Sequence, residues 1–411
     1  MKLTLDYGLM LKEKYGTPLY VYDVNYMKNV MSLYTNYFKS NCFKTEVAFA
    51  SKAFCVKEMV RLVASCGLSL DCVSVGELYT AKVSGFDLSR VFFHGNNKSS
   101  SDLLFALENG VGTIVVDNLM ELEVLEDLCN KLGKSCNILI RLNVGVEAHT
   151  HKFIVTAHVD SKFGVLHGSD DYLAMLDIVS NSKYINFIGF HSHIGSQIFD
   201  LKAFDAAIYK LVSYCAGFDK KLVLNLGGGF SVWYTDEDKP ISFDVVSKHL
   251  ISVCEECLDK LGVSIDKLVI EPGRSIVAEA GATLYTIGYK KQTPNKLYYF
   301  IDGGMTDNIR PALYQAKYSA DVLGKEELPK NKIVCVAGKC CESGDIIMEN
   351  IPLPDASSGD LLITYSTGAY GYAMSSNYNK ALTPAVVFIE DGNDKLVVKR
   401  QSLEELIMRE L

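Results

Sequence analysis

Chemically reactive side chains recur at the ends of short apolar runs in the first two-thirds of the chain. The groups at or just after these ends are, in chain order, Ser51-Lys52, Asp71, His94, Arg141, His191 with His193, Gly227-Gly228-Gly229 and Glu271-Pro272-Gly273-Arg274. The carboxyl ends of parallel strands meet at one face of a barrel, and barrel enzymes place their chemistry there. We therefore predict that these residues share one catalytic site.

Three consecutive glycines, Gly227-Gly228-Gly229, follow the seventh apolar run. Glycines let backbone N–H groups approach an anion closely, and the loops after strands seven and eight of such barrels frequently hold a phosphate. Gly273 and Arg274 follow the eighth run, where Arg274 adds a positive charge. Three glycines alone indicate a tight turn; their position here favours a phosphate site.

Lys52, at the end of the first run, suggests a specific phosphate-bearing cofactor. A lysine amine can hold pyridoxal 5'-phosphate (PLP) as a Schiff base. A carboxylate at Glu271 would then favour the protonated pyridine nitrogen, which makes the ring a stronger electron sink. His193 could stack on the ring. The alternatives are an exposed lysine at position 52 and a hydrogen-bonded core histidine at position 193.

The elements that must position these groups alternate between strand and helix. Eight runs read as strands: Glu46–Ala50, Leu68–Cys72, Val91–His94, Gly112–Val116, Asn137–Arg141, Asn186–Phe190, Leu222–Leu226 and Leu268–Glu271. Amphipathic helical patterns with polar caps and terminal glycines lie between them. This rhythm predicts a closed (β/α)8 TIM barrel. A doubly wound open sheet is the competing interpretation, but its glycine fingerprint after the first strand is absent.

The rhythm changes after about residue 275, where strands are joined by turns and long helical patterns are missing. Asp391-Gly392 is predicted to form a hairpin turn. We expect residues 275–411 to form a mainly β sandwich domain and residues 31–274 to form the PLP-binding barrel. Residues 1–30 contain the strand Pro18–Asp23, which we expect to join the β domain.

The composition narrows the class of protein further. The net charge is −8, which favours neither nucleic acid nor an anionic membrane as a partner. Neither a signal peptide nor a membrane-spanning run is expected. The 12 cysteines are scattered and several lie within apolar runs, which is typical of a reduced cytoplasmic protein. Cys254 and Cys257 are interpreted as structural, and His149 and His151 as loop residues, so no metal site is predicted.

The motifs resemble those of the fold-type III PLP-dependent decarboxylases. The resemblance lies in Phe49–Ala53, His191–Gln197, Gly227–Phe230 and Glu271–Arg274, and it extends over nearly the whole chain in order. The diaminopimelate decarboxylases in particular are matched by Gly145–Lys152, Asp160–Gly164, Asp307–Tyr314, Cys341–Asp345 and Gly368–Tyr370. The resemblance implies an alanine racemase-like TIM barrel with a C-terminal β-sandwich, and decarboxylation of meso-2,6-diaminopimelate to L-lysine.

The resemblance also implies a role for each site residue. Lys52 would form the internal aldimine, Glu271 would pair with the ring nitrogen, and Cys341 would supply a proton after carbon dioxide leaves. The remaining cofactor-binding residues would be His193, Ser196, Gly227, Gly228, Gly229, Gly273, Arg274 and Tyr370. The substrate-binding residues would be Arg274, Arg310, Tyr314, Glu342 and Tyr370. Cys341 and Glu342 would reach the site of a partner subunit, which implies an obligate homodimer.

Three alternatives stay open at this stage. A decarboxylase of ornithine or lysine would share the fold, but Arg310 favours a substrate with a second carboxylate. An amino-acid racemase would need a base opposite Lys52, and a PLP carrier would lack the β domain.

The neighbouring thiol of Cys340 competes with Cys341 as proton donor; we choose Cys341 because Glu342-Ser343 follows it.

Overall fold

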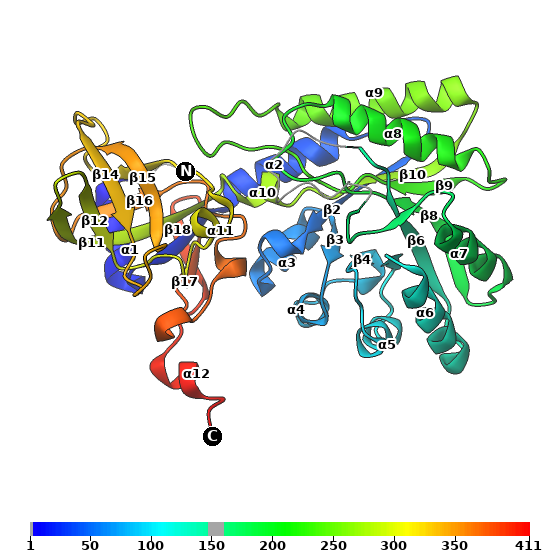
Figure 1. Cartoon of the computed structure of the whole chain (residues 1–411), viewed down its shortest axis with the longest axis horizontal. Helices are drawn as coiled ribbons and strands as arrows, with labels where there is room; N and C mark the ends of the chain where they lie inside the picture. Colours follow the sequence, from blue (N-terminus) through cyan, green and yellow to red (C-terminus); the bar gives the residue numbers. More distant parts are fainter. Residues whose placement is uncertain (1–2, 147–159) are drawn as a thin grey trace. The chain divides into compact units, whose positions relative to one another are not determined.

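The structure is a computed structural model that describes residues 3–146 and 160–411 (Figure 1). The expectation for His149 and His151 lies outside these residues. The chain divides into two compact units. The barrel unit comprises residues 29–231 and 240–273, and the β unit comprises residues 1–28, 232–239 and 274–411.

The barrel unit contains eight parallel strands that close on themselves. They are β2 (Lys44–Ala50), β3 (Ser69–Cys72), β4 (Val91–Phe93), β5 (Thr113–Val116), β6 (Cys136–Asn143), β8 (Ile185–His191), β9 (Leu222–Asn225) and β10 (Ile265–Ile270). Each strand pairs with the next in this order, and β10 pairs with β2 to complete the ring. A two-residue strand, β7 (Val165–Leu166), pairs with β6. The predicted TIM barrel is therefore confirmed, and the open-sheet interpretation is wrong.

Helices lie around the outside of this ring (Figure 1). They are α3 (Lys57–Ser65), α4 (Val75–Val83), α5 (Ser100–Glu108), α6 (Leu119–Leu132), α7 (Asp170–Asn181), α8 (Lys202–Cys215) and α9 (Phe243–Leu261). Their ends follow the sequence signals: Ser99 and Asp102 form a capping box on α5, and Gly133 ends α6 in the left-handed conformation. Side chains from several of the strands, including Ala48, Val115 and Val269, pack together in the interior.

The β unit is a sandwich built on a mixed sheet. Its strands are β1 (Leu19–Asp23), β11 (Gly281–Gln292), β12 (Leu297–Ile301), β13 (Ala320–Val322), β14 (Lys332–Ala337), β15 (Ile346–Leu353), β16 (Leu361–Thr364), β17 (Ala385–Glu390) and β18 (Asn393–Val398). The long strand β11 pairs with β1 and β16 along its first half and with β12 along its second half. A register shift between Ile287 and Lys290 interrupts the pairing of β11 with β12.

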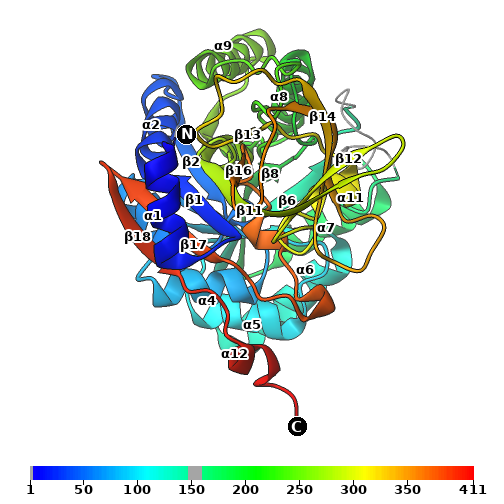
Figure 2. The same cartoon turned by 90° about the vertical axis from the view of Figure 1, so that its left-hand side faces the viewer.

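The N-terminal strand β1 lies inside this sheet, as expected from the sequence. It pairs antiparallel with β11 and parallel with β17. A helix that the sequence analysis did not predict, α1 (Leu5–Tyr15), precedes it; the Thr4 side chain caps its start. Figure 2 shows α1 beside β1 and β17. Leu11 of α1 packs against Leu19, Leu284 and Ile363 of the sheet. The N-terminal segment thus contributes a helix as well as a strand to the β unit.

Short helices complete the β unit: α10 (Arg274–Val277), α11 (Arg310–Tyr314) and α12 (Leu403–Ile407). A longer helix, α2 (Val24–Tyr37), carries the chain from the β unit into the barrel unit. The predicted hairpin turn is present between β17 and β18, with positive φ angles of 52° at Asp391 and 78° at Gly392. Within the described residues, no helix is long and apolar enough to cross a membrane.

Candidate active site

The barrel unit brings a buried carboxylate together with two imidazoles. Glu271 follows β10, His94 follows β4 and His191 ends β8. Nε2 of His94 lies 2.8 Å from Oε1 of Glu271, and Nε2 of His191 lies 3.4 Å from Oε2. Burial alone would raise the pKa of Glu271, but these imidazoles outweigh it and hold that pKa well below its usual value. Burial lowers the pKa of His191 to about 3, so this imidazole is neutral at physiological pH.

Asn225, the last residue of β9, completes the setting of Glu271. Its Nδ2 donates to Oε1 of Glu271 at 2.6 Å, while its Oδ1 accepts the Gly227 N–H at 2.9 Å. The second bond fixes the amide orientation, so an N–H group faces the carboxylate. His94, His191 and Glu271 could otherwise suit a metal ion, since their ligand atoms lie within 4.8 Å of one another. Because Asn225 already donates a hydrogen bond to Oε1 of Glu271, we interpret these residues as a hydrogen-bond network rather than a metal site.

The sequence analysis did not single out Asn225 and assigned no partner to His94. The signal was present, because both are polar residues at the carboxyl ends of buried strands. The sequence does not reveal the strand register, which brings both side chains to the carboxylate of Glu271.

The glycine run lies where no side chain would fit. A Cβ atom on Gly228 would meet the Glu271 carbonyl oxygen at 2.2 Å, and one on Gly229 would meet the Gly195 carbonyl oxygen at 2.4 Å. Gly229 also has a φ of +111°, which L-residues rarely adopt. Gly273 is similarly confined, because a Cβ atom there would meet the Ala50 Cβ at 2.8 Å. The bare backbone of these loops is suited to close approach by a ligand.

Lys52 and His193 lie at the same carboxyl-terminal end of the barrel strands. Lys52 belongs to a 3-10 turn (Ser51–Ala53) directly after β2, and its Nζ is 3.5 Å from Oδ2 of Asp71 on β3. Its side chain is 43% exposed, so the amine is accessible. Nδ1 of His193 accepts the Gly228 N–H at 3.2 Å. Burial and the Lys52 charge hold the pKa of His193 well below its usual value. Ser196 follows on the same loop and is partly buried.

The β unit holds a second group of the predicted residues. We define the arginine–tyrosine cluster as Arg274, Arg310, Tyr234, Tyr318 and Tyr370. Nη1 of Arg274 donates to the Tyr234 hydroxyl at 2.5 Å, and Nη1 of Arg310 donates to the Tyr318 hydroxyl at 2.5 Å. The Arg310 guanidinium also lies over the Tyr234 ring, 5.0 Å from its centroid. Two buried cations therefore converge on one tyrosine.

Tyr370 reaches this cluster from a strained loop that follows β16. Its φ is +63°, a conformation that costs energy in a residue other than glycine. Gly368 makes the loop possible, because a Cβ there would overlap the Val277 carbonyl oxygen at 1.8 Å. The Arg274 guanidinium lies 4.9 Å from the centroid of the Tyr370 ring. The loop thus places the Tyr370 ring close to the guanidinium of Arg274, the first residue of α10.

The two neighbouring cysteines differ in their surroundings. The Cys340 N–H donates to Oδ2 of Asp345 at 2.7 Å, and burial together with the Asp345 charge raises the pKa of the Cys340 thiol to about 11. Cys341 is exposed, and its N–H donates to Oδ1 of Asn379 at 2.8 Å. Glu342 is also exposed. Tyr314, the last residue of α11, is partly buried one turn from Arg310.

The comparisons with known proteins point in one direction. The sequence model of the family described as "Pyridoxal-dependent decarboxylase, pyridoxal binding domain" matches residues 27–278. A diaminopimelate decarboxylase from Bacillus subtilis is 48% identical over 98% of this chain and 93% of its own length. One from Bacillus methanolicus is 46% identical over 96% of this chain and 92% of its own length. The chain belongs to the diaminopimelate decarboxylase family.

Solved structures agree with this assignment. The crystal structure of the diaminopimelate decarboxylase from M. jannaschii, in co-complex with L-lysine, has a TM-score of 0.91 and 31% sequence identity. The match covers 98% of this chain and 94% of that chain. The chain is therefore an enzyme, a PLP-dependent amino-acid decarboxylase, and PLP is its cofactor.

The residues of this family member fit PLP. Glu271 is an ionised carboxylate that is only 4% exposed, and it is oriented by His94 and Asn225. Such a group is suited to a protonated pyridine nitrogen. The loops at Gly227–Gly229 and Gly273 leave no space for side chains, as a phosphate cradle requires. The Lys52 amine is accessible at the same end of the barrel.

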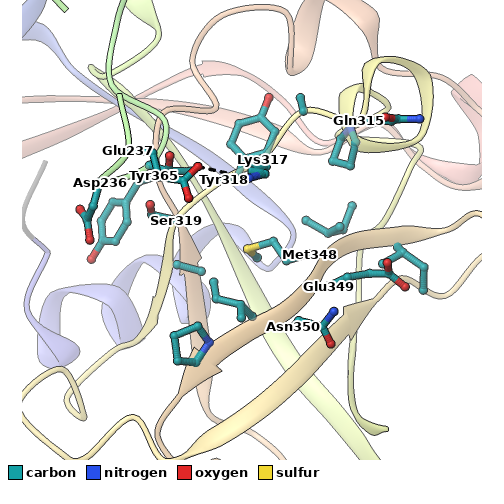
Figure 3. Close-up of a pocket in the computed structure, with 18 of the residues that line it drawn as sticks. Asp236, Glu237, Gln315, Lys317, Tyr318, Ser319, Met348, Glu349, Asn350 and Tyr365 are labelled. Atoms are coloured by element: carbon teal, nitrogen blue, oxygen red, sulfur yellow. Dashed lines mark hydrogen bonds and ion pairs between the residues drawn. The ribbon is translucent and has the colours of Figure 1, made fainter. Parts of the chain in front are cut away.

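The β unit of this decarboxylase also contains a large hollow of about 970 Å³, shown in Figure 3. Tyr318, Met348, Asn350 and Tyr365 lie on its wall, and an ion pair of 3.2 Å joins Lys317 to Glu237 at its rim. Among the described residues of this wall, only Tyr318 belongs to the arginine–tyrosine cluster, and none is a predicted catalytic residue. Its size therefore does not mark it as the catalytic site.

Proposed function

We propose that this chain catalyses the PLP-dependent decarboxylation of meso-2,6-diaminopimelate to L-lysine and carbon dioxide, the last step of lysine biosynthesis. The observation that carries the substrate assignment is the convergence of Arg274 and Arg310 on Tyr234. Diaminopimelate carries a second carboxylate at its far end. Two guanidiniums in a nearly dry cluster provide bidentate, charge-assisted hydrogen bonds to such a group.

The same cluster argues against a decarboxylase of ornithine or lysine. Those substrates end in a bare ammonium group, which would be repelled by Arg274 and Arg310. Both arginines are less than 10% exposed, with values of 7% and 8%, so water screens this repulsion poorly. On the strength of the family motif, Tyr314 is assigned to the same carboxylate, and Tyr370 is assigned to the cofactor phosphate and the substrate. Glu342 is assigned to the ammonium group beside it.

The roles at the barrel end follow from the chemistry of each group. Lys52 holds the cofactor, Glu271 pairs with its ring nitrogen, and His193 packs against its ring. Ser196 and the backbone of Gly227, Gly228, Gly229, Gly273 and Arg274 bind its phosphate. When bound, PLP withdraws electrons from the α-carbon of the substrate, so the bond to the departing carboxylate breaks more easily. The Arg274 side chain serves the far carboxylate, since it extends to Tyr234.

Cys341 supplies the proton that replaces the carboxylate at the α-carbon. Cys340 is a poorer donor, because its pKa of about 11 makes proton release unfavourable near neutral pH. The exposure of Cys341 and Glu342 supports a role outside their own subunit. We therefore propose a homodimer in which these two residues serve the site of the partner subunit. None of the 12 cysteines forms a disulfide, which supports a cytoplasmic location.

The deciding experiment measures carbon dioxide release and lysine formation by the purified protein with added PLP. Diaminopimelate, L-ornithine and L-lysine are each supplied as substrate. We expect lysine to form from diaminopimelate and no release from the two basic amino acids. Turnover of ornithine or lysine without turnover of diaminopimelate would overturn the assignment. Loss of optical activity without carbon dioxide release would indicate a racemase.

A further inference from the structure

The arginine–tyrosine cluster contains two tyrosines that the family motifs do not assign to substrate or cofactor. We infer that Tyr234 and Tyr318 are positioning residues that fix the Arg274 and Arg310 guanidiniums, and thereby determine selectivity for a ligand with a distal carboxylate. The inference rests on the proposed function and deepens it, because it names what orients the carboxylate-binding arginines.

Tyr234 contacts both cations. Its hydroxyl accepts the 2.5 Å hydrogen bond from Arg274, and its ring faces Arg310 at 5.0 Å. Burial would raise the pKa of Tyr234, but the charges of the two arginines outweigh it and lower that pKa. The two guanidiniums therefore stabilise negative charge on the phenol oxygen that accepts the Arg274 hydrogen bond. A single side chain thus sets the spacing between the two guanidiniums.

Tyr318 fixes Arg310 from a second direction. Its hydroxyl accepts from Nη1 of Arg310 at 2.5 Å, and its ring meets the Tyr234 ring edge-on with centroids 5.3 Å apart. Tyr234 is itself anchored, because the Ser319 hydroxyl donates to its carbonyl oxygen at 2.9 Å. Tyr318 and Ser319 are consecutive, so one short segment holds both the arginine and its neighbouring tyrosine.

This arrangement has a direct consequence for binding. A free arginine side chain loses rotamer entropy when it docks on a carboxylate, and its planar fork must be aligned to form two hydrogen bonds. Here the tyrosines have already aligned the fork before a ligand arrives, which lowers the cost of binding. A ligand without the distal carboxylate gains nothing from this preorganisation. The tyrosines should therefore affect selectivity more than catalysis.

The test compares two ligands that differ by one carboxylate, L-lysine and cadaverine. As the product, L-lysine faces the cofactor with its ε-amino group, so its carboxylate takes the distal position; cadaverine has no carboxylate. Their dissociation constants are measured with the holoenzyme through the visible absorbance of the cofactor, so no turnover is needed. We expect Tyr234→Phe and Tyr318→Phe each to weaken L-lysine binding about tenfold, which is typical of losing one charged hydrogen bond. Cadaverine binding should stay within about twofold of wild type. With diaminopimelate, KM should rise by the same factor while kcat is retained.

Tyr299→Phe is the matched control, since Tyr299 is a buried tyrosine whose hydroxyl accepts the Ala356 N–H outside the cluster. It should leave both ligands unchanged. Equal weakening of L-lysine and cadaverine by the cluster variants would overturn the inference, as would an unchanged preference. If one variant fails to fold, the other still decides the question. A wild-type enzyme that does not prefer L-lysine over cadaverine would instead contradict the proposed function.

Discussion

Nε2 of His94 lies 2.8 Å from Oε1 of Glu271, and both side chains are about 95% buried, with exposures of 5% and 4%. Asn225 donates to the same oxygen, so Oε1 has two donors. Oε2 remains the oxygen available to a further partner, with His191 as its 3.4 Å neighbour. The network therefore both keeps the carboxylate ionised and selects which oxygen it offers.

This relationship predicts how the activity of a His94→Leu variant depends on pH. Removing the imidazole removes the largest influence that opposes burial, so the pKa of Glu271 should rise. Since Glu271 acts as a carboxylate, it would then become protonated at a higher pH. The acid limb of the kcat profile should shift to higher pH, and turnover at neutral pH should fall on the order of tenfold.

The control for His94 is His249→Leu, because His249 also pairs with a carboxylate, Asp205, at 2.6 Å. It is located on α9, away from Glu271. His249→Leu should leave the pH profile unchanged. An unshifted acid limb in His94→Leu would show that His94 does not support Glu271.

Lys52→Ala should abolish the visible absorbance of bound cofactor. The Lys52 amine is the accessible amine at the end of β2, and an alanine there cannot attach PLP covalently. The measurement is the absorbance spectrum after incubation with PLP and gel filtration. Lys44→Ala, at the other end of β2, removes an exposed lysine paired with Asp266 and should retain the spectrum. An unchanged spectrum in Lys52→Ala would refute the assignment.

The sequence predicted the barrel part of this site because each reactive group follows a buried strand. In a parallel barrel all strands expose their carboxyl ends at one face, so chain position alone groups Lys52, His94 and Glu271. Strand register cannot be derived this way. The pairing of His191 with Asn225, and of β10 with β2, decides which side chains touch Glu271. Because the register was unknown, the sequence analysis included Asn225 in an apolar run and gave it no role.

The arginine–tyrosine cluster was less predictable for a different reason. Arg310 and Tyr370 were found through family motifs, but Tyr234 lies on a loop within the barrel sequence and joins the β unit. Loops carry no periodicity from which a partner can be inferred. The helix α1 was missed although Thr4 and Gly16 mark its two ends. Few of its residues are buried, so its apolar spacing is weak.

Cys341→Ala should slow turnover of diaminopimelate strongly, by on the order of a hundredfold, which is typical of removing a proton donor. Cys340→Ala should have little effect, because that thiol lies against Asp345 and its pKa is about 11. Steady-state kcat of the two variants, compared at equal cofactor occupancy, provides the measurement. The opposite ranking would move the proton donor by one residue.

Asp307 provides a prediction about stability. This aspartate in the β unit is 2% exposed, and its carboxylate accepts a hydrogen bond from the Tyr285 hydroxyl at 2.6 Å. Burial nevertheless raises its pKa from 3.8 to about 7. The folded chain therefore binds this proton more tightly than the unfolded chain does. Between about pH 4 and pH 7 the free energy of unfolding should fall as pH rises, because only the unfolded carboxyl ionises freely.

Asp307→Asn should remove this component of the pH dependence. An amide keeps the shape of the protonated acid and has no charge to desolvate, so the variant should be more stable than wild type at pH 7 and similar at pH 4. Urea denaturation of both proteins across this range gives the difference in free energy of unfolding, which should grow by a few kcal/mol. Asp266→Asn, an exposed aspartate paired with Lys44, should show no such trend. A difference independent of pH would mean that Asp307 is already ionised in the folded enzyme at pH 4, and that its hydrogen bonds outweigh its burial.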